Sequence, residues 1–172
     1  MACRNTARSR NKADIELTAN KALDDLRIVP TDRSDADSVA DLYLASRAAM
    51  LPDLRRVHSD STVRHWIATC LLPDTEVWLA KLGQEGTVAG MLALDGNFVD
   101  QLYLAPAWFR HGIGTRLIAH AKALRPEGLS LYCFKRNEAA RHFYERQGFR
   151  LALERDGRSN EEEEPDCLYL WP

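Results

Sequence analysis

The chain has 172 residues, of which 45% are hydrophobic and 28% are charged, and its formal net charge at pH 7 is −2. This length favours one domain with a sizeable buried core, and the near-neutral charge gives no reason to expect binding to nucleic acid or to a membrane surface. No apolar run is long enough to span a bilayer, so the composition excludes a membrane-spanning protein.

The first 25 residues differ from the rest of the chain. They contain four early basic residues, but no apolar segment follows these, which excludes a secretory signal. An Arg-rich, acid-poor start is compatible with a transit peptide, and a disordered basic tail is the simpler interpretation. The stretch "IELTANKALDDL" can form a short helix. We therefore expect a tail at residues 1–25 and one domain at 26–172.

Apolar patterns predict the elements of the first half of this domain. Gly90 interrupts one strand and marks a bulge or a close backbone approach. The expected elements are a strand at 26–30, a helix capped by Ser34 or Asp35, a helix starting at Ser59 or Ser61, and a hairpin of 76–82 and 88–94 about the turn "GQEG".

The second half begins with the long strand "NFVDQLYLA" and ends with two strands. Asn137 opens a helix that Gly148 closes in the left-handed region, with Phe149 packed against the cap. The remaining elements are a helix from Ile113, a buried strand "LSLYCF", and the strands "FRLALERD" and "CLYLWP" on either side of an acidic loop. The resulting order of strands and helices predicts a mixed α/β fold.

Neither the cysteines nor the histidines form a metal-binding pattern. The four cysteines lie far apart without a CxxC pair, which favours reduced thiols in a cytoplasmic protein. Four histidines, at 65, 111, 120 and 142, show no ligand spacing, and the four tryptophans are more simply core residues than a stacking surface. The sequence therefore predicts no metal site.

The stretch "WFRHGIGTRL" combines two glycines with basic residues at the start of a helix. Glycines let backbone N–H groups point at an oxyanion, and the helix dipole adds positive potential, so the turn predicts an anion site. A Walker loop is excluded because Thr115-Arg116 replaces its Lys-Ser/Thr ending, and a dinucleotide loop is excluded because Leu117 replaces its third glycine. A tight structural turn would explain the glycines equally well.

A second motif follows in "NEAARHFYERQGF", which puts Asn137, Ala140 and Tyr144 close to one face of a helix. Together with "LYLAP" and the glycine turn, this motif resembles the GNAT superfamily of N-acetyltransferases, from Leu26 to about Trp171. "FRHGIG" is similar to the pyrophosphate loop of that family, except that Phe109 stands where Gln or Arg is usual. The resemblance implies a mostly antiparallel central sheet, flanked by helices and split between its fourth and fifth strands.

The resemblance also implies acetyl-CoA as the co-substrate. Backbone N–H groups of the glycine turn would bind the pyrophosphate, with Arg110 and Arg116 supplying the positive charge that Phe109 lacks. The strand around Leu104 would pair with pantetheine and aim its N–H at the thioester carbonyl, while Asn137 would hydrogen-bond the pantetheine arm. The implied cofactor-binding residues are Leu102, Tyr103, Leu104, Phe109, Arg110, His111, Gly112, Ile113, Gly114, Thr115, Arg116, Asn137, Ala140 and Tyr144.

Catalytic roles follow from the same resemblance. Tyr144 would protonate the leaving thiolate, because a phenol with a pKa of about 10 remains protonated at neutral pH; read alone, it is a half-buried tyrosine beside Phe143. Asp100 is a candidate base, expected to share a strand face with Phe98 and Leu102, although a solvent-facing aspartate is an equal interpretation. His58, Glu76 or a water chain are alternatives.

The loop "GRSNEEEEPD" carries consecutive carboxylates that include Glu161 and Glu162. In the resembled fold it borders the acceptor cleft, so we expect it to attract a cationic amine, although a solvated acidic loop is the simpler interpretation. The function implied is acetyl transfer from acetyl-CoA to a primary amine of a small molecule or peptide, by direct attack and in a possible homodimer. A non-catalytic acyl-CoA-binding module is the alternative.

Overall fold

The computed structural model describes residues 22–172, so all but the last four residues of the expected tail lie outside it. Residues 22–24 are helical, and the part of the expected short helix that precedes them lies outside the described residues. The strands are β1 (Arg27–Pro30), β2 (Glu76–Leu82), β3 (Thr87–Asp95), β4 (Phe98–Leu104), β5 (Leu129–Phe134), β6 (Arg150–Arg155) and β7 (Asp166–Trp171). The main helices are α2 (Ala36–Met50), α3 (Asp60–Trp66), α4 (Leu72–Asp74), α5 (Ile113–Leu124) and α6 (Glu138–Arg146), with a π-helical segment at Ile67–Leu71 and 3-10 turns at Arg33–Asp35 and Pro106–Trp108.

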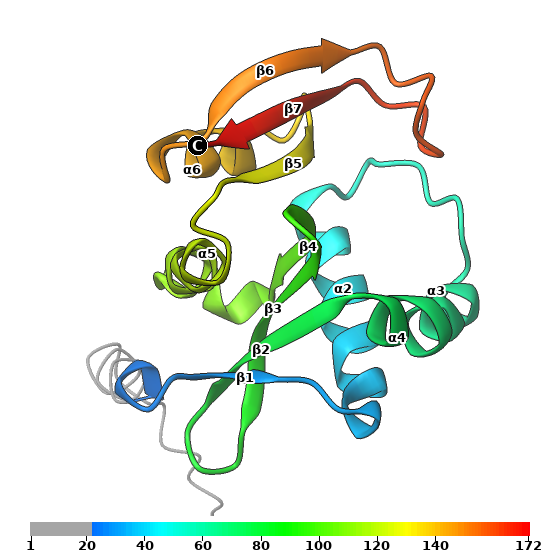
Figure 1. Cartoon of the computed structure of the whole chain (residues 1–172). Coiled ribbons are helices and arrows are strands. Elements are labelled where there is room, and N and C mark those ends of the chain that lie inside the picture. The colour runs from blue at the N-terminus through cyan, green and yellow to red at the C-terminus, as the bar shows by residue number, and fades with distance from the viewer. Residues whose placement is uncertain (1–21) are drawn as a thin grey trace, which may run out of the picture.

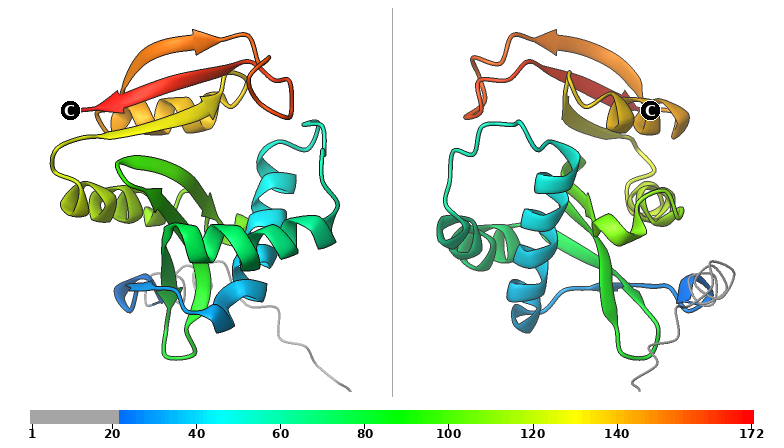
Figure 2. Two further views of the ribbon diagram at one scale, coloured as in Figure 1. Left: turned by 45° about the vertical axis from the view of Figure 1, so that its right-hand side comes forward. Right: turned by 180° about the vertical axis from the view of Figure 1, so that it is seen from behind.

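The seven strands form one sheet in the order β1-β2-β3-β4-β5-β7-β6 (Figure 1). All neighbouring pairs are antiparallel except β4 and β5, which are parallel and share the single register pair Phe98↔Ser130. Beyond that pair the two strands diverge, and the views of Figure 2 show the β5-β7-β6 part turned away from β4. The expected mixed sheet with a split between its fourth and fifth strands is confirmed.

The two faces of the first four strands bury two separate cores. Side chains alternate along β2, so Leu79 packs toward α2 while Ala80 packs toward α5. β3 is buried on both faces from Ala89 to Leu94, because helices cover both sides of the sheet. The core on the α5 side of the sheet, which we call the second core, continues from α5 to α6 and to the inner faces of β5 and β7. The glycine turn and the opening between β4 and β5 both border this second core.

Local signals predicted most element ends, with one correction. The N-cap residue of α2 is Asp35, one of the two residues predicted for that position, but its side chain does not cap α2. The Asp35 side chain accepts instead from the Asp32 N–H, in a capping box around the preceding 3-10 turn in which the Asp32 side chain accepts from the Ser34 N–H. Ser59 caps α3 as expected.

Of the two features predicted for Gly90, the structure shows the bulge. The β2–β3 register shifts beside it, between Ala80 and Lys81, as a bulge requires. A Cβ atom at Gly90 would lie 2.7 Å from the end of the Leu104 side chain, so a larger residue here would require that side chain to shift.

Candidate functional site

The glycine turn leads into α5 without a side-chain cap. Gly112 is the N-cap residue at φ 81°, a left-handed conformation that favours glycine, and among residues 22–172 no side chain caps this helix end. The first N–H groups of a helix have no partner within it, so those of Ile113, Gly114 and Thr115 are available to an anion. The Arg116 N–H already donates to the Gly112 carbonyl at 3.1 Å.

The basic residues around this turn differ in their exposure and in the groups that they contact. Arg110 is exposed and also left-handed, at φ 65°. The Arg116 guanidinium donates to the Leu23 carbonyl at 3.1 Å, so its charge lies against the segment that precedes β1. His111 bonds through Nδ1 with the carbonyl of Phe109 at 2.8 Å and thereby braces the turn. Of the two arginines expected to compensate for Phe109, Arg110 is therefore the freer to face an anion.

The edge of β4 that faces β5 is open past the single pair at Phe98. The Ala105 N–H donates to the Ala89 carbonyl, so these residues form a hydrogen-bonded pair with β3. Hydrogen-bonded and non-hydrogen-bonded pairs alternate in an antiparallel ladder, so the backbone groups of Leu102 and Leu104 point away from β3, toward the open edge. This edge can accept an extended ligand as an added strand.

Helix α6 lies across the opening from this edge. Asn137 is its N-cap, and the Asn137 Oδ1 accepts from the Ala140 N–H at 3.2 Å. The side-chain oxygen therefore holds the helix end, which leaves the amide NH₂ as the group that can face a ligand. The helix ends at Gly148, at φ 84°, as predicted.

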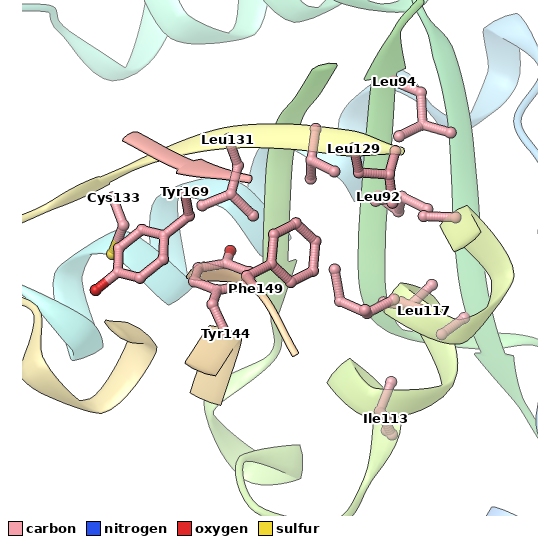
Figure 3. Packing of buried hydrophobic residues seen from close by; sticks show 14 of the residues in the cluster. Leu92, Leu94, Ile113, Leu117, Leu129, Leu131, Cys133, Tyr144, Phe149 and Tyr169 are labelled. Carbon is pink, nitrogen blue, oxygen red and sulfur yellow. The ribbon is translucent and has the colours of Figure 1, made fainter. Parts of the chain in front are cut away.

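Tyr144 is the buried residue of α6, and its ring packs against Phe149 and Tyr169 (Figure 3) and beside Phe143. The ring centroids of Phe143, Phe149 and Tyr169 lie 5.2, 5.7 and 6.4 Å away. Burial raises the pKa of the Tyr144 phenol, and the nearby Cys133 thiol adds to the rise. The phenol is thus a proton donor at every physiological pH.

Asp100 does not occupy the position that strand alternation predicts. The β3–β4 register changes from Leu94↔Val99 to Ala93↔Gln101, so Asp100 is the extra residue of a β-bulge. Val99 and Leu102 both pack into the core under α5, which puts Phe98 and Leu102 on opposite faces. The expectation that Asp100 shares a face with both was therefore wrong, because the bulge interrupts the two-residue period.

The other candidate bases lie in different places. Glu76 binds Arg125 just after the C-terminal end of α5, about one helix length, or about 18 Å, from the glycine turn. His58 is exposed and bonds through Nε2 with Glu161 at 2.6 Å. The Asp100 carboxylate is half-buried and accepts from the Gln101 side chain at 3.1 Å. Of these three, Asp100 lies on the strand that carries Leu104.

A polar cluster that the sequence reading missed connects the opening to α2. The ring centroids of Tyr43 and Tyr103 lie 4.7 Å apart, and Arg47 donates to the Tyr43 hydroxyl at 2.8 Å. Burial raises the pKa of Tyr103, with the Tyr43 and Tyr144 phenols adding to the rise. Burial alone would lower the pKa of Arg47, but Tyr43, Tyr103 and Glu162 outweigh it and raise the pKa. Of Tyr43, Arg47 and Tyr103, only Tyr103 was among the predicted site residues, because these three residues meet through tertiary contact.

A cavity of about 340 Å³ opens beside this cluster, between α2, the segment after it, and the acidic loop. Most of its lining is apolar. The charged or titratable side chains in its wall are Arg47, Arg56, His58, Asp60 and Glu162. Two of the four residues predicted to contact substrate, His58 and Glu162, therefore line it, whereas Asp100 and Glu161 do not.

The carboxylates of the acidic loop are paired with cations of the same chain. Exposed ion pairs of this kind contribute about 0–1 kcal/mol to the free energy of folding. Arg47 and Glu162 are mostly buried and form the stronger pair. The pairs are Glu161 with His58, Glu162 with Arg47, Glu163 with Arg55, Glu164 with Arg136, and Asp166 with Arg155. Glu162 of the loop lines the cavity, but within the described residues the loop does not present the unpaired negative charge from which we expected a cationic acceptor.

The remaining titratable residues form no further site. Within residues 22–172, no three His, Cys, Asp or Glu side chains lie close enough to hold a metal ion. Cys70, Cys133 and Cys167 are free thiols, and Cys3 lies outside the described residues. Among the described helices, none is long and apolar enough to cross a membrane.

Comparisons with known proteins identify similar sequences and folds. Residues 73–151 match the Acetyltransferase (GNAT) domain. The chain is 35% identical over 80 residues to the peptidyl-lysine N-acetyltransferase YjaB of Salmonella typhimurium, a match that covers 46% of this chain and 54% of that protein. The aligned part therefore spans about half of the length of this curated relative.

Two solved structures have the same fold. The apo form of YjaB from Escherichia coli has a TM-score of 0.71 at 20% identity, with 85% of this chain and 97% of that chain covered. The PaiA N-acetyltransferase of Thermoplasma acidophilum, solved in complex with coenzyme A, has a TM-score of 0.63 at 18% identity, with 84% and 97% covered. Identities this low establish the fold alone.

Proposed function

The chain belongs to the GNAT superfamily, and on that premise we propose that it transfers an acetyl group from acetyl-CoA to a primary amine in a ternary complex. The observation that carries the proposal is the juxtaposition of an uncapped helix N-terminus at Gly112 with the open edge of β4. The first suits a pyrophosphate and the second suits an extended pantetheine arm. That a structural neighbour was solved with coenzyme A supports this assignment.

The donor would be held mostly by backbone groups. The N–H groups of residues 112–115 would bind the pyrophosphate oxygens, and Arg110 would add positive charge. Leu102 and Leu104 would pair with pantetheine, and the Asn137 amide would donate to the same arm. The Leu104 N–H, on the open edge, would donate to the thioester carbonyl, whose oxygen gains negative charge as the amine attacks.

Proton transfer would involve two groups. The amine must lose a proton to become a nucleophile, and the departing sulfur must gain one as the new amide bond forms and the C–S bond breaks. Tyr144 would supply the proton to sulfur; its raised pKa supports this role, since the phenol stays protonated until the thiolate forms. Asp100, or a water chain, would accept the amine proton, with His58 as a second candidate.

The acceptor would enter from the cavity beside α2. Its buried Tyr43 and half-buried Arg47 and Glu162 lie at the end of the polar cluster that reaches Tyr103 and Tyr144. The relative YjaB is named for acetylation of peptidyl lysine. We extend this to the chain as a primary amine carried by a peptide or by a small molecule.

Calorimetry with acetyl-CoA, followed by thiol detection of released CoA with a panel of lysine peptides and small amines, tests the proposal. Saturable binding and amine-dependent CoA release are expected. Binding without release for any amine would indicate an acyl-CoA-binding module instead. No binding of acetyl-CoA would contradict the donor site itself.

A further inference from the structure

Three consecutive carboxylates of the acidic loop, Asp156–Pro165, contact three separate basic residues of the segment Arg47–His58. The side-chain N···O distances are 2.6 Å for His58 and Glu161, 2.7 Å for Arg47 and Glu162, and 3.4 Å for Arg55 and Glu163. The partners are more than 100 residues apart in sequence. Figure 2 shows the two segments facing each other across the side of the molecule that holds the cavity.

The acidic loop has an internal scaffold that fixes how it presents these carboxylates. The Asn160 side chain donates to the Glu164 carbonyl at 2.8 Å and accepts from the Glu164 N–H at 3.1 Å. Gly157 has no room for a Cβ atom, which would lie 2.6 Å from the Glu164 carbonyl carbon. Because the loop holds its own shape, it can dock on the basic segment, or leave it, as one unit.

Glu162 is the residue that the loop inserts into the cavity wall. Its side chain is 16% exposed, and that of Arg47 is 26% exposed. Arg56 and Asp60 neutralise each other in the same wall. Without the loop, Arg47 on α2 would lose its carboxylate partner and His58 its hydrogen-bond partner, with Arg55 at the margin of the cavity.

We propose that the acidic loop is a built-in occupant of the acceptor site, and that the acceptor amine belongs to a lysine on an acidic peptide, whose carboxylate replaces Glu162 on Arg47. This inference rests on the proposed acetyl transfer. A peptide fits better than a small amine because the three basic residues extend from the cavity onto the exposed surface. Several carboxylates along an extended chain can meet them at once.

The strengths of the contacts make the exchange feasible. The Arg55 and His58 pairs are exposed and therefore weak, and the loop is anchored at its base by the two bonds between Arg155 and Asp166, at 2.7 and 2.6 Å. A basic peptide fits poorly, because recruiting Glu162 to a cationic acceptor would leave the largely buried Arg47 with only the Tyr43 hydroxyl.

Three lysine peptides that differ only in their flanking residues, Glu, Gln or Lys, test the inference with the full chain at saturating acetyl-CoA. We expect KM to be lowest for the Glu peptide, by about tenfold relative to the Lys peptide, as charge-assisted bonds to Arg47 predict. Glu162→Gln should lower KM for the Glu peptide by about two- to fivefold, because a competitor is removed. Arg47→Met should raise KM for the Glu peptide more than for the Gln peptide.

A matched control is Glu154→Gln on β6, outside the cavity. This substitution removes an exposed carboxylate that pairs with Lys135, and it should change no KM. A preference for the Lys peptide, with a KM that rises in Glu162→Gln, would overturn the inference, as would equal KM values for all three peptides. Turnover of small amines alone would overturn it and leave the proposed function intact. If no amine releases CoA, anisotropy of the labelled peptides still decides whether the chain prefers the acidic one.

Discussion

The proposed donor side and the proposed acceptor side of the opening between β4 and β5 are built by different interactions. On the donor side, the backbone conformation at Gly112 and the unpaired edge at Leu104 would provide the binding groups. On the acceptor side, the groups are side chains joined across more than 100 residues, as Arg47 and Glu162 are. A single side-chain substitution should therefore alter the acceptor side, whereas the backbone contacts on the donor side should change only where the backbone conformation changes.

This contrast separates the readouts that variants should affect. A donor-side change should alter acetyl-CoA affinity or turnover with every acceptor. An acceptor-side change should alter acceptor KM or the local stability of the acidic loop, with acetyl-CoA binding retained.

Tyr144→Phe should have the largest effect, a loss of about 10²–10⁴-fold in kcat, which is the usual contribution of an acid or base. The ring packing with Phe149 and Tyr169 is kept, and the Tyr144 hydroxyl makes no hydrogen bond to another residue in the described part of the chain, so the melting temperature should hardly change. Pre-steady-state release of CoA measures the chemical step. Tyr132→Phe on the outer face of β5 is the matched control, and equal rates in the two variants would remove Tyr144 from the mechanism.

Gly112→Val should weaken acetyl-CoA binding by about tenfold or more, because each lost charge-assisted hydrogen bond contributes about 1.5–3 kcal/mol. Gly83→Val is a matched control in the β2–β3 turn. Both glycines have positive φ, 81° and 63°, and neither has a heavy atom within 4 Å of an added Cβ. Both variants should lose about 1–2 kcal/mol of stability from the left-handed backbone. If calorimetry gives them the same acetyl-CoA affinity, the turn does not bind the pyrophosphate.

The donor side was predictable because its signals are local. Gly112, Asn137 and Gly148 each determine a cap or turn within a few residues, and the structure has all three where the sequence predicted them. The sheet and its split followed from the family resemblance and from strand periodicity. The bulge at Asp100 was missed because a strand of alternating pattern gives no sign of one extra residue.

The acceptor side was not predictable for the opposite reason. The run from Glu161 to Glu164 reads as excess negative charge, yet its charge is balanced by cations that the fold brings from distant positions. Nothing in the local sequence around Arg47 or Tyr43 indicates which residues they will meet. Such pairings depend on the docking of two loops and become visible only in three dimensions.

Asp166 anchors the acidic loop and should give it a pH-dependent stability. Burial would raise the pKa of this carboxyl, but hydrogen bonds from Arg155 and Asn160 outweigh it, so the pKa lies below its ordinary value. The unfolded chain therefore binds more protons, and the stabilisation is complete above the ordinary Asp pKa of about 3.9 and is lost as pH falls through the folded pKa.

Asp166→Asn should accordingly cost about 1–3 kcal/mol in urea unfolding at pH 7, and the difference from the parent should shrink as the pH falls below about 4. Asp95→Asn, an exposed carboxylate at the end of β3, is the control and should have no comparable effect. A difference that stays constant down to pH 3 would mean that Asp166 contributes through packing and not through its charge.

The smallest effect is expected for the outer pair of Arg55 and Glu163. Their side chains are 63% and 76% exposed, so solvent screens the attraction and the pair must offset the entropy of two ordered side chains. A double-mutant cycle with Arg55→Gln and Glu163→Gln should give an interaction energy below about 1 kcal/mol, which falls further in 1 M salt, where the Debye length is about 3 Å. The same cycle on Arg47 and Glu162, which are mostly buried, should give a larger and less salt-sensitive energy. Equal energies for the two pairs would mean that the acidic loop is held uniformly along its length and that Glu162 has no special place in the acceptor cavity.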